Sequence, residues 1–231
     1  MSTLPSPRHS LRYDPIGGLV NAAALAVTAL MLATIAVRAP CAGEAIRLLA
    51  FGDSLIAGYG LAREDAFPRR LERALAAHGL AVTVIDAGVS GDTSADGLAR
   101  LDWALATPGG APDAVIVELG ANDALRGIDP EVTYANLDAI VGEIRRRRLP
   151  VLLAGMRAPP NMGRDYADAF DGIYSRLAAA HGVPLYPFFL DGVAAEPALN
   201  QVDGIHPNAE GVQVIVRGIL PAVKDLLEAQ P

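Results

Sequence analysis

The chain has a single cysteine and four histidines among its 231 residues. Cys41 has no second cysteine to pair with, which excludes an internal disulfide, and no Cys/His cluster has the spacing of metal ligands. We therefore predict no metal site, and we expect packing alone to stabilise the fold. With so few histidines, a site that needs an imidazole has few candidates.

Basic residues are also scarce. The chain has 19 Lys and Arg against 26 Asp and Glu, and removal of the first 41 residues leaves 16 against 25, a net charge of −9. Because a nucleic-acid groove requires positive charge, we expect no nucleic-acid partner. A hydrophobic content of 52% and a charged content of 19% exclude a disordered or low-complexity chain and favour one domain with a real core.

The one long hydrophobic run lies near the N-terminus, from Ile16 to Val37. Two arginines precede it and small residues follow it, which is the pattern of a signal peptide. The run is also long enough to remain as an uncleaved membrane anchor. Both alternatives place the remainder of the protein in the periplasm or outside the cell. We therefore divide the chain into a signal peptide or signal anchor, 1–43, and a folded domain, 44–231.

After residue 44, short apolar runs alternate with amphipathic stretches, as in buried parallel strands joined by crossover helices. The predicted strands are 45–51, 82–87, 114–119, 151–154 and 184–186. Apolar residues at helical spacing predict buried helix faces at Leu137, Ile140, Val141 and Ile144 and at Phe170, Ile173, Tyr174 and Leu177. A last helix from about 208 to 229 completes five βα units. The pattern predicts an α/β fold, a three-layer α/β/α sandwich with a five-stranded parallel sheet.

Polar clusters follow four of the five predicted strands. They are Gly52-Asp53-Ser54-Leu55, Ser90-Gly91-Asp92-Thr93, Gly120-Ala121-Asn122-Asp123 and Asp203-Gly204-Ile205-His206-Pro207. The carboxyl ends of parallel strands share one edge, where open α/β proteins bind their ligands. We therefore expect the four clusters to converge on one site.

These residue types suit nucleophilic catalysis. Ser54 lies at a strand-to-helix junction and is the candidate nucleophile, but a serine hydroxyl needs an imidazole base that a carboxylate orients. His206 is the only histidine outside the leader and the predicted helix ends, and Asp203 lies three residues before it. An oxyanion also needs donors that are not bonded elsewhere, and the candidates are the backbone N–H groups of Ser54 and Gly91 and the side-chain amide of Asn122.

The motifs resemble those of the SGNH hydrolase superfamily, also called GDSL esterases, whose name-giving residues match Ser54, Gly91, Asn122 and His206. Stretches around these positions are most similar to the bacterial periplasmic thioesterase I, arylesterase and lysophospholipase L1 group. The resemblance covers about residues 45–227 and departs from the closest relatives at Ala121, where glycine is expected. It implies a flavodoxin-like fold, a triad of Ser54, His206 and Asp203, and no cofactor.

We therefore expect a serine hydrolase that cleaves carboxylic esters and thioesters through an acyl-serine intermediate. Two alternatives stay open: a carbohydrate O-acetyl esterase or acetyltransferase, and a catalytically silent binding module. The expected partner is a small ester or lipid substrate. We expect a monomer, with membrane contact only through an uncleaved N-terminal segment.

Three further expectations concern the surroundings of the site. The loop 156–166 is predicted to form one wall of an acyl-chain groove, to which Leu125 and Met162 contribute apolar contacts. Asp92 and Asp123 are expected to fix loops through hydrogen bonds to backbone rather than to hold a metal. Trp103, the only tryptophan, is predicted to lie in the core.

Overall fold

The computed structural model describes residues 45–229, so the predicted signal segment 1–43 lies outside the described residues. The strands are β1 (Ile46–Gly52), β2 (Val82–Gly88), β3 (Ala114–Glu118), β4 (Val151–Ala154) and β5 (Leu185–Tyr186). The α-helices are α2 (Ser54–Ala57), α3 (Phe67–Ala77), α4 (Ser94–Leu105), α5 (Ala121–Leu125), α6 (Pro130–Arg146), α7 (Arg164–His181) and α8 (Ala209–Glu228). Short 3₁₀ helices span Arg63–Asp65, Pro160–Met162 and Pro197–Leu199. In this described part, no helix combines the length and apolarity that a membrane crossing requires.

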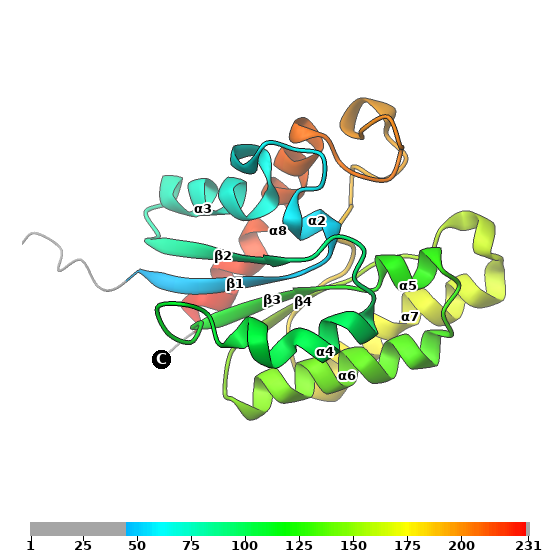
Figure 1. The fold of residues 1–231 in the computed structure, drawn as a ribbon, viewed down its shortest axis with the longest axis horizontal. Coiled ribbons are helices and arrows are strands. Elements are labelled where there is room, and N and C mark those ends of the chain that lie inside the picture. The colour runs from blue at the N-terminus through cyan, green and yellow to red at the C-terminus, as the bar shows by residue number, and fades with distance from the viewer. Residues whose placement is uncertain (1–44, 230–231) are drawn as a thin grey trace, which may run out of the picture. The chain divides into compact units, whose positions relative to one another are not determined.

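The strands form one parallel sheet in the order β2-β1-β3-β4-β5. In Figure 1 the strands run side by side with their carboxyl ends at the same edge, near the short helix α2. The register pairs Gly52 with Gly88 on one side and with Glu118 on the other, so three strands end level with one another. The predicted strands, their parallel arrangement and the α/β class are confirmed.

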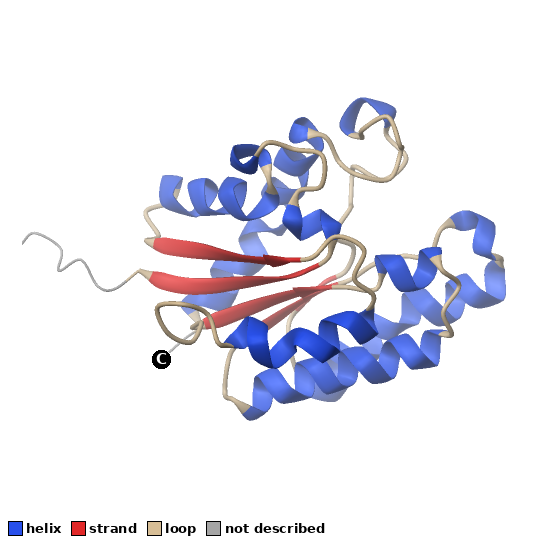
Figure 2. Ribbon diagram, viewed as in Figure 1, coloured by secondary structure: helices blue, strands red, loops and turns tan. Residues whose placement is uncertain are grey.

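Helices cover both faces of the sheet, as the helices in Figure 2 show. Helices α3 and α8 pack against each other on one face, and α4, α6 and α7 pack in a row on the other. The predicted faces of α6 and α7 are buried, because their apolar residues recur every three to four positions and form one stripe. The three-layer α/β/α sandwich is therefore confirmed.

The prediction for Trp103 is wrong, since its side chain is 76% exposed. The buried face of α4 carries Leu101, Ala104 and Leu105. Trp103 lies two residues after Leu101, about 200° around the helix, and so it points away from the sheet. Proximity in sequence to buried leucines was not sufficient, because the helical period decides which face a residue occupies.

Candidate active site

Ser54 is the first residue of α2, directly after the end of β1 at Gly52 and the N-cap residue Asp53. The Asp53 side chain accepts a hydrogen bond at 2.9 Å from the backbone N–H of Leu55, which fixes the tight strand-to-helix turn. Ser54 is only 9% exposed, whereas Asp53 is fully buried. The turn therefore holds the serine hydroxyl at the sheet edge in a fixed position.

The loop before α8 brings His206 and Asp203 to this serine. Ser54 Oγ lies 3.0 Å from His206 Nε2, and His206 Nδ1 lies 2.7 Å from Asp203 Oδ2. With the proton on Nδ1, the histidine donates to Asp203 and its Nε2 accepts from the serine hydroxyl. The structure thus joins the three predicted residues in one hydrogen-bonded chain.

Asp203 is held as a carboxylate although it is exposed to solvent. Its Oδ1 accepts hydrogen bonds from the backbone N–H groups of His206 at 3.0 Å and Ile205 at 2.9 Å. These two bonds, together with the one from the His206 ring, lower the pKa of Asp203 to about 2. A permanent negative charge therefore faces Nδ1 and stabilises a positive charge on the imidazole.

The backbone donors predicted for an oxyanion hole are available. Within residues 45–229, neither the Ser54 N–H nor the Gly91 N–H donates to a protein acceptor. Gly91 has a φ of 90°, a conformation that favours glycine, and Arg126 Nη2 donates to its carbonyl oxygen at 2.7 Å. The two N–H groups can therefore donate to an incoming oxyanion without losing an existing bond.

Asn122 differs from the expectation of a free donor. Its Nδ2 group donates to Asp53 Oδ2 at 3.1 Å and to the Asp92 carbonyl oxygen at 3.0 Å. Both amide hydrogens therefore already have an acceptor. An oxyanion at this position must share one of them in a three-centre bond or replace one acceptor.

Asp123 fixes a loop through a hydrogen bond to backbone, as expected, whereas for Asp92 that prediction is wrong. Asp123 is buried and accepts at 2.7 Å from the backbone N–H and at 2.5 Å from the hydroxyl of Ser94. Asp92 instead forms an ion pair with Arg100 at 2.5 Å, and the same arginine donates to the Gly52 carbonyl oxygen at 2.8 Å. Within residues 45–229, no three His, Cys, Asp or Glu side chains gather as a metal site would require.

Two further residues lie against the site and were not predicted from the sequence. The ring of Tyr59 lies 4.6 Å from that of His206, centroid to centroid, and limits how the imidazole can tilt. Glu118 is fully buried at the end of β3, beside Gly52. A charged residue that closes the apolar strand Ala-Val-Ile-Val-Glu was a visible signal for Glu118, whereas the Tyr59 contact depends on the path of a loop.

The two predicted groove residues lie near the same edge but differ in exposure. Leu125 is 50% exposed at the end of α5, whereas Met162 is partly buried in the loop after β4. The segments that carry them contact each other, because the hydroxyl of Tyr166, near the start of α7, donates to the carbonyl oxygen of Ile128, just after α5, at 2.8 Å. The terminal methyl of Met162 also lies 3.4 Å from the position that a Cβ on Gly127 would take.

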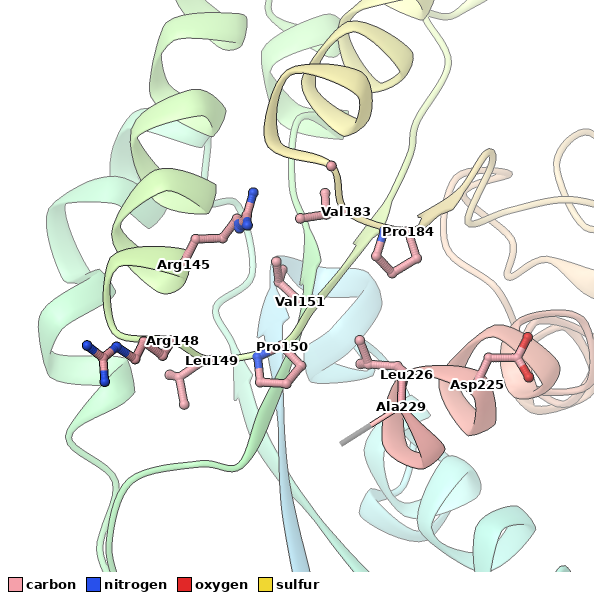
Figure 3. Close-up of a pocket in the computed structure, with 11 residues that line it drawn as sticks. Arg145, Arg148, Leu149, Pro150, Val151, Val183, Pro184, Asp225, Leu226 and Ala229 are labelled. Atoms are coloured by element: carbon pink, nitrogen blue, oxygen red, sulfur yellow. The ribbon is translucent and has the colours of Figure 1, made fainter. Parts of the chain in front are cut away.

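A pocket of about 630 Å³ lies elsewhere, as Figure 3 shows. Its lining includes Val151, the first residue of β4, and residues near the ends of α6, α7 and α8. It therefore lies at the amino edge of the sheet, opposite to Ser54. This pocket contains none of the predicted site residues.

Comparisons with known proteins identify relatives of most of the described residues. The protein-family model described as GDSL-like Lipase/Acylhydrolase family matches residues 50–214. An arylesterase of Vibrio mimicus is 44% identical over 164 residues, which cover 71% of this chain and 81% of the relative. The thioesterase 1/protease 1/lysophospholipase L1 of Escherichia coli strain K12 is 42% identical over 169 residues, which cover 73% of this chain and 79% of the relative.

A solved structure shows the same relationship in three dimensions. The crystal structure of AlinE4, described as an SGNH-hydrolase family esterase, is 49% identical to the chain. It superposes with a TM-score of 0.68, over 80% of this chain and 98% of the solved one.

Proposed function

The chain belongs to the GDSL-like lipase/acylhydrolase family and is a serine hydrolase of esters, and we propose that Ser54, His206 and Asp203 are its catalytic triad. The observation that carries this proposal is the continuous contact from Ser54 Oγ through His206 to Asp203, at 3.0 and 2.7 Å. A serine hydroxyl within hydrogen-bond reach of an oriented imidazole is the arrangement that activates the nucleophile.

In the first half of the reaction, Ser54 Oγ attacks the acyl carbon of the ester while His206 Nε2 takes the hydroxyl proton. The carbonyl π bond opens and leaves a tetrahedral oxyanion. The N–H groups of Ser54 and Gly91 and the side chain of Asn122 stabilise this charge. The oxyanion then collapses, the bond to the alcohol or thiol breaks, and His206 returns its proton to the leaving group.

In the second half, water attacks the acyl-serine ester. His206 again accepts the proton, the same donors hold the second oxyanion, and collapse releases the carboxylic acid and regenerates the Ser54 hydroxyl. Asp203 stays ionised throughout and stabilises the imidazolium that forms in each half. The triad, the oxyanion donors and water account for every step of this cycle.

The proposed substrates are neutral or zwitterionic esters with a medium-length acyl chain, such as aryl esters and lysophospholipids. The acyl chain is proposed to lie between the end of α5, which carries Leu125, and the segment after β4 that carries Met162. Each buried methylene contributes about 0.8 kcal/mol, so kcat/KM should rise up to about fourfold per added carbon until the groove ends.

A series of p-nitrophenyl esters from acetate to decanoate tests both the activity and the substrate class. Hydrolysis that increases with chain length and is abolished in Ser54→Ala supports the proposal. A profile confined to acetate favours the carbohydrate O-acetyl esterase or acetyltransferase, and no turnover favours the silent binding module. Leu125→Ala should flatten the rise, while Trp103→Ala, on an exposed helix face away from the site, provides the control.

We also propose that the domain 44–231 acts outside the cytoplasm, in the periplasm or as a secreted protein, with 1–43 as signal peptide or anchor. The basic residues before the hydrophobic run and the small residues after it support this location. Mass spectrometry of the mature N-terminus distinguishes a cleaved segment from a retained one.

A further inference from the structure

Glu118 occupies the space directly behind the turn that carries Ser54. It ends β3 in register with Gly52 of β1, and it is fully buried. A Cβ on Gly52 would lie 2.7 Å from Glu118 Oε2, so the carboxyl group fills the room left by the missing side chain. Because residue 52 is glycine, the Glu118 carboxyl group can lie directly against the turn that contains Asp53.

Neither carboxyl oxygen of Glu118 has a hydrogen-bond partner of normal geometry within residues 45–229, and neither is exposed to water. The backbone N–H of Asp53 approaches the carboxyl but does not complete such a bond. An ionised carboxylate buried in this way carries a large desolvation penalty. A protonated carboxyl removes the problem, because it gains an O–H donor and needs only an acceptor. The Asp53 carboxyl, which is also fully buried, is the adjacent acceptor.

Asp53 connects this buried group to the site. Its Oδ1 accepts from the Leu55 N–H at 2.9 Å, and its Oδ2 accepts from Asn122 Nδ2 at 3.1 Å. Glu118 therefore neighbours Asp53, and Asp53 is hydrogen-bonded to the Asn122 amide that the proposed function assigns to the oxyanion.

We propose that Glu118 is a positioning residue for the oxyanion hole, whose carboxyl keeps its proton and donates it to Asp53, which in turn holds Asn122. This inference rests on the proposed function, because that function assigns Asn122 to the oxyanion. Burial, and then the neighbouring Asp53 carboxylate, raise the pKa of Glu118 well above its usual range. Burial also raises the pKa of Asp53, to about 6. Two carboxyls buried side by side favour a state in which one of them keeps its proton.

The proton matters because Asn122 already has two acceptors. A hydrogen bond from Glu118 withdraws negative charge from Asp53 and makes it a weaker competitor for the Asn122 hydrogen. The oxyanion can then share that hydrogen in the transition state. Without the proton from Glu118, Asp53 retains its full charge and holds the Asn122 amide away from the substrate.

Other charged and titratable groups around the pair come from several elements. Asp53 faces the imidazole of the loop before α8 and a carboxylate of the loop after β2. That carboxylate forms an ion pair with an arginine of α4. Glu118 faces the hydroxyl-bearing ring of a tyrosine of α7. These groups are His206, Asp92, Arg100 and Tyr174. None of them donates a hydrogen bond to Glu118, so the Asp53 contact is the one that the proposal tests.

Two substitutions at Glu118 distinguish the effect of its hydrogen-bond donor from the effect of its side-chain volume. Glu118→Gln keeps an N–H donor for Asp53, whereas Glu118→Met keeps a similar volume without a donor. We expect Glu118→Met to lower kcat by roughly 10–100-fold with little change in KM, the range for loss of a hydrogen bond to a charged group. Glu118→Gln should retain most of the kcat.

The same substitutions are then made in Asn122→Ala. If Glu118 acts through Asn122, Glu118→Met has almost no further effect on kcat in that background. An equal loss of kcat in both backgrounds would overturn the proposal, and so would equal losses in Glu118→Met and Glu118→Gln. Ile140→Val, a small core change in α6, controls for lowered stability without an altered charge.

Infrared spectroscopy tests the proton without reference to activity. The unmodified protein should show the C=O band of a neutral buried carboxyl at neutral pH, and Glu118→Gln should lack it. Absence of this band from the unmodified protein would overturn the proposal. If the unmodified protein is not labelled at Ser54 by an organophosphonate, the proposed function fails instead, so the two failures are distinct.

Discussion

Asn122 contributes one side-chain amide to a hole that also has two backbone N–H groups. Because an oxyanion donor acts mainly in the transition state, we expect Asn122→Ala to lower kcat by roughly 10²–10³-fold with a smaller change in KM. Steady-state kinetics with a p-nitrophenyl ester measures both constants. A variant altered chiefly in KM would show that Asn122 only holds the substrate.

Glu118 also gives the stability of the fold a pH dependence. Burial raises its pKa above the unfolded value of 4.5, so the folded chain keeps a proton that the unfolded chain releases as pH rises. The free energy of unfolding therefore declines with pH above 4.5, by up to about 1.4 kcal/mol per pH unit, until the folded group also ionises.

Glu118→Gln removes this slope, because glutamine does not titrate. The unfolding free energy of the variant minus that of the unmodified protein should therefore be more positive at pH 8 than at pH 5. Urea unfolding at the two pH values measures it. Two parallel pH profiles would mean that Glu118 titrates alike in the folded and unfolded chains.

The three triad residues could be predicted from the sequence, because each is a distinctive residue type that follows a predicted strand. The hydrogen-bond partners of the other site residues could not be predicted. Ser54 and His206 follow predicted strands, and strand ends must meet at one edge of a parallel sheet. The occupied amide of Asn122 depends on where the Asp92 carbonyl points, which sequence does not encode locally. Glu118 carries a signal in the sequence, because an acid that ends a buried apolar run is unusual.

Among the elements, α2 depends on its close approach to β2. A Cβ on Gly88 would lie 2.8 Å from the Asp53 carbonyl oxygen and 2.8 Å from Ala57 Cα, so α2 packs directly on the glycine. We expect Gly88→Ala to displace α2, to lower thermal stability and to reduce kcat, because Ser54 is the first residue of that helix.

Gly172→Ala is the matched control for this change. Gly172 lies within α7, and a Cβ there would meet no atom within 4 Å. Alanine should stabilise the helix by about 0.5–1 kcal/mol and leave kcat unchanged. Thermal denaturation and ester hydrolysis of both variants provide the comparison; an unchanged kcat in Gly88→Ala would show that α2 tolerates the displacement.

Strands and long helices were predictable because burial imposes a period on their sequence. The face of α7 at Phe170, Ile173, Tyr174 and Leu177 is buried as expected. Short elements were not predictable, since α5 has five residues and the 3₁₀ turn Pro160–Met162 has three. Their positions follow from loop contacts such as the one between Tyr166 and Ile128.

For the whole molecule, net charge selects among substrates. Residues 42–231 carry a formal charge of −9, so long-range electrostatics oppose the approach of a polyanion such as acyl-CoA. We expect a neutral aryl ester to have a higher kcat/KM than acyl-CoA of equal chain length, by a ratio that falls as ionic strength rises. A ratio independent of salt would contradict an electrostatic cause.

The central claim is that Ser54 is the nucleophile, and covalent labelling tests it most directly. An organophosphonate should react once per chain, and peptide mass spectrometry should locate the adduct on Ser54. Ser54→Ala should lose both the adduct and ester turnover while its circular dichroism spectrum stays that of the folded protein. An adduct on Ser90, the other serine that follows a strand, would contradict the account.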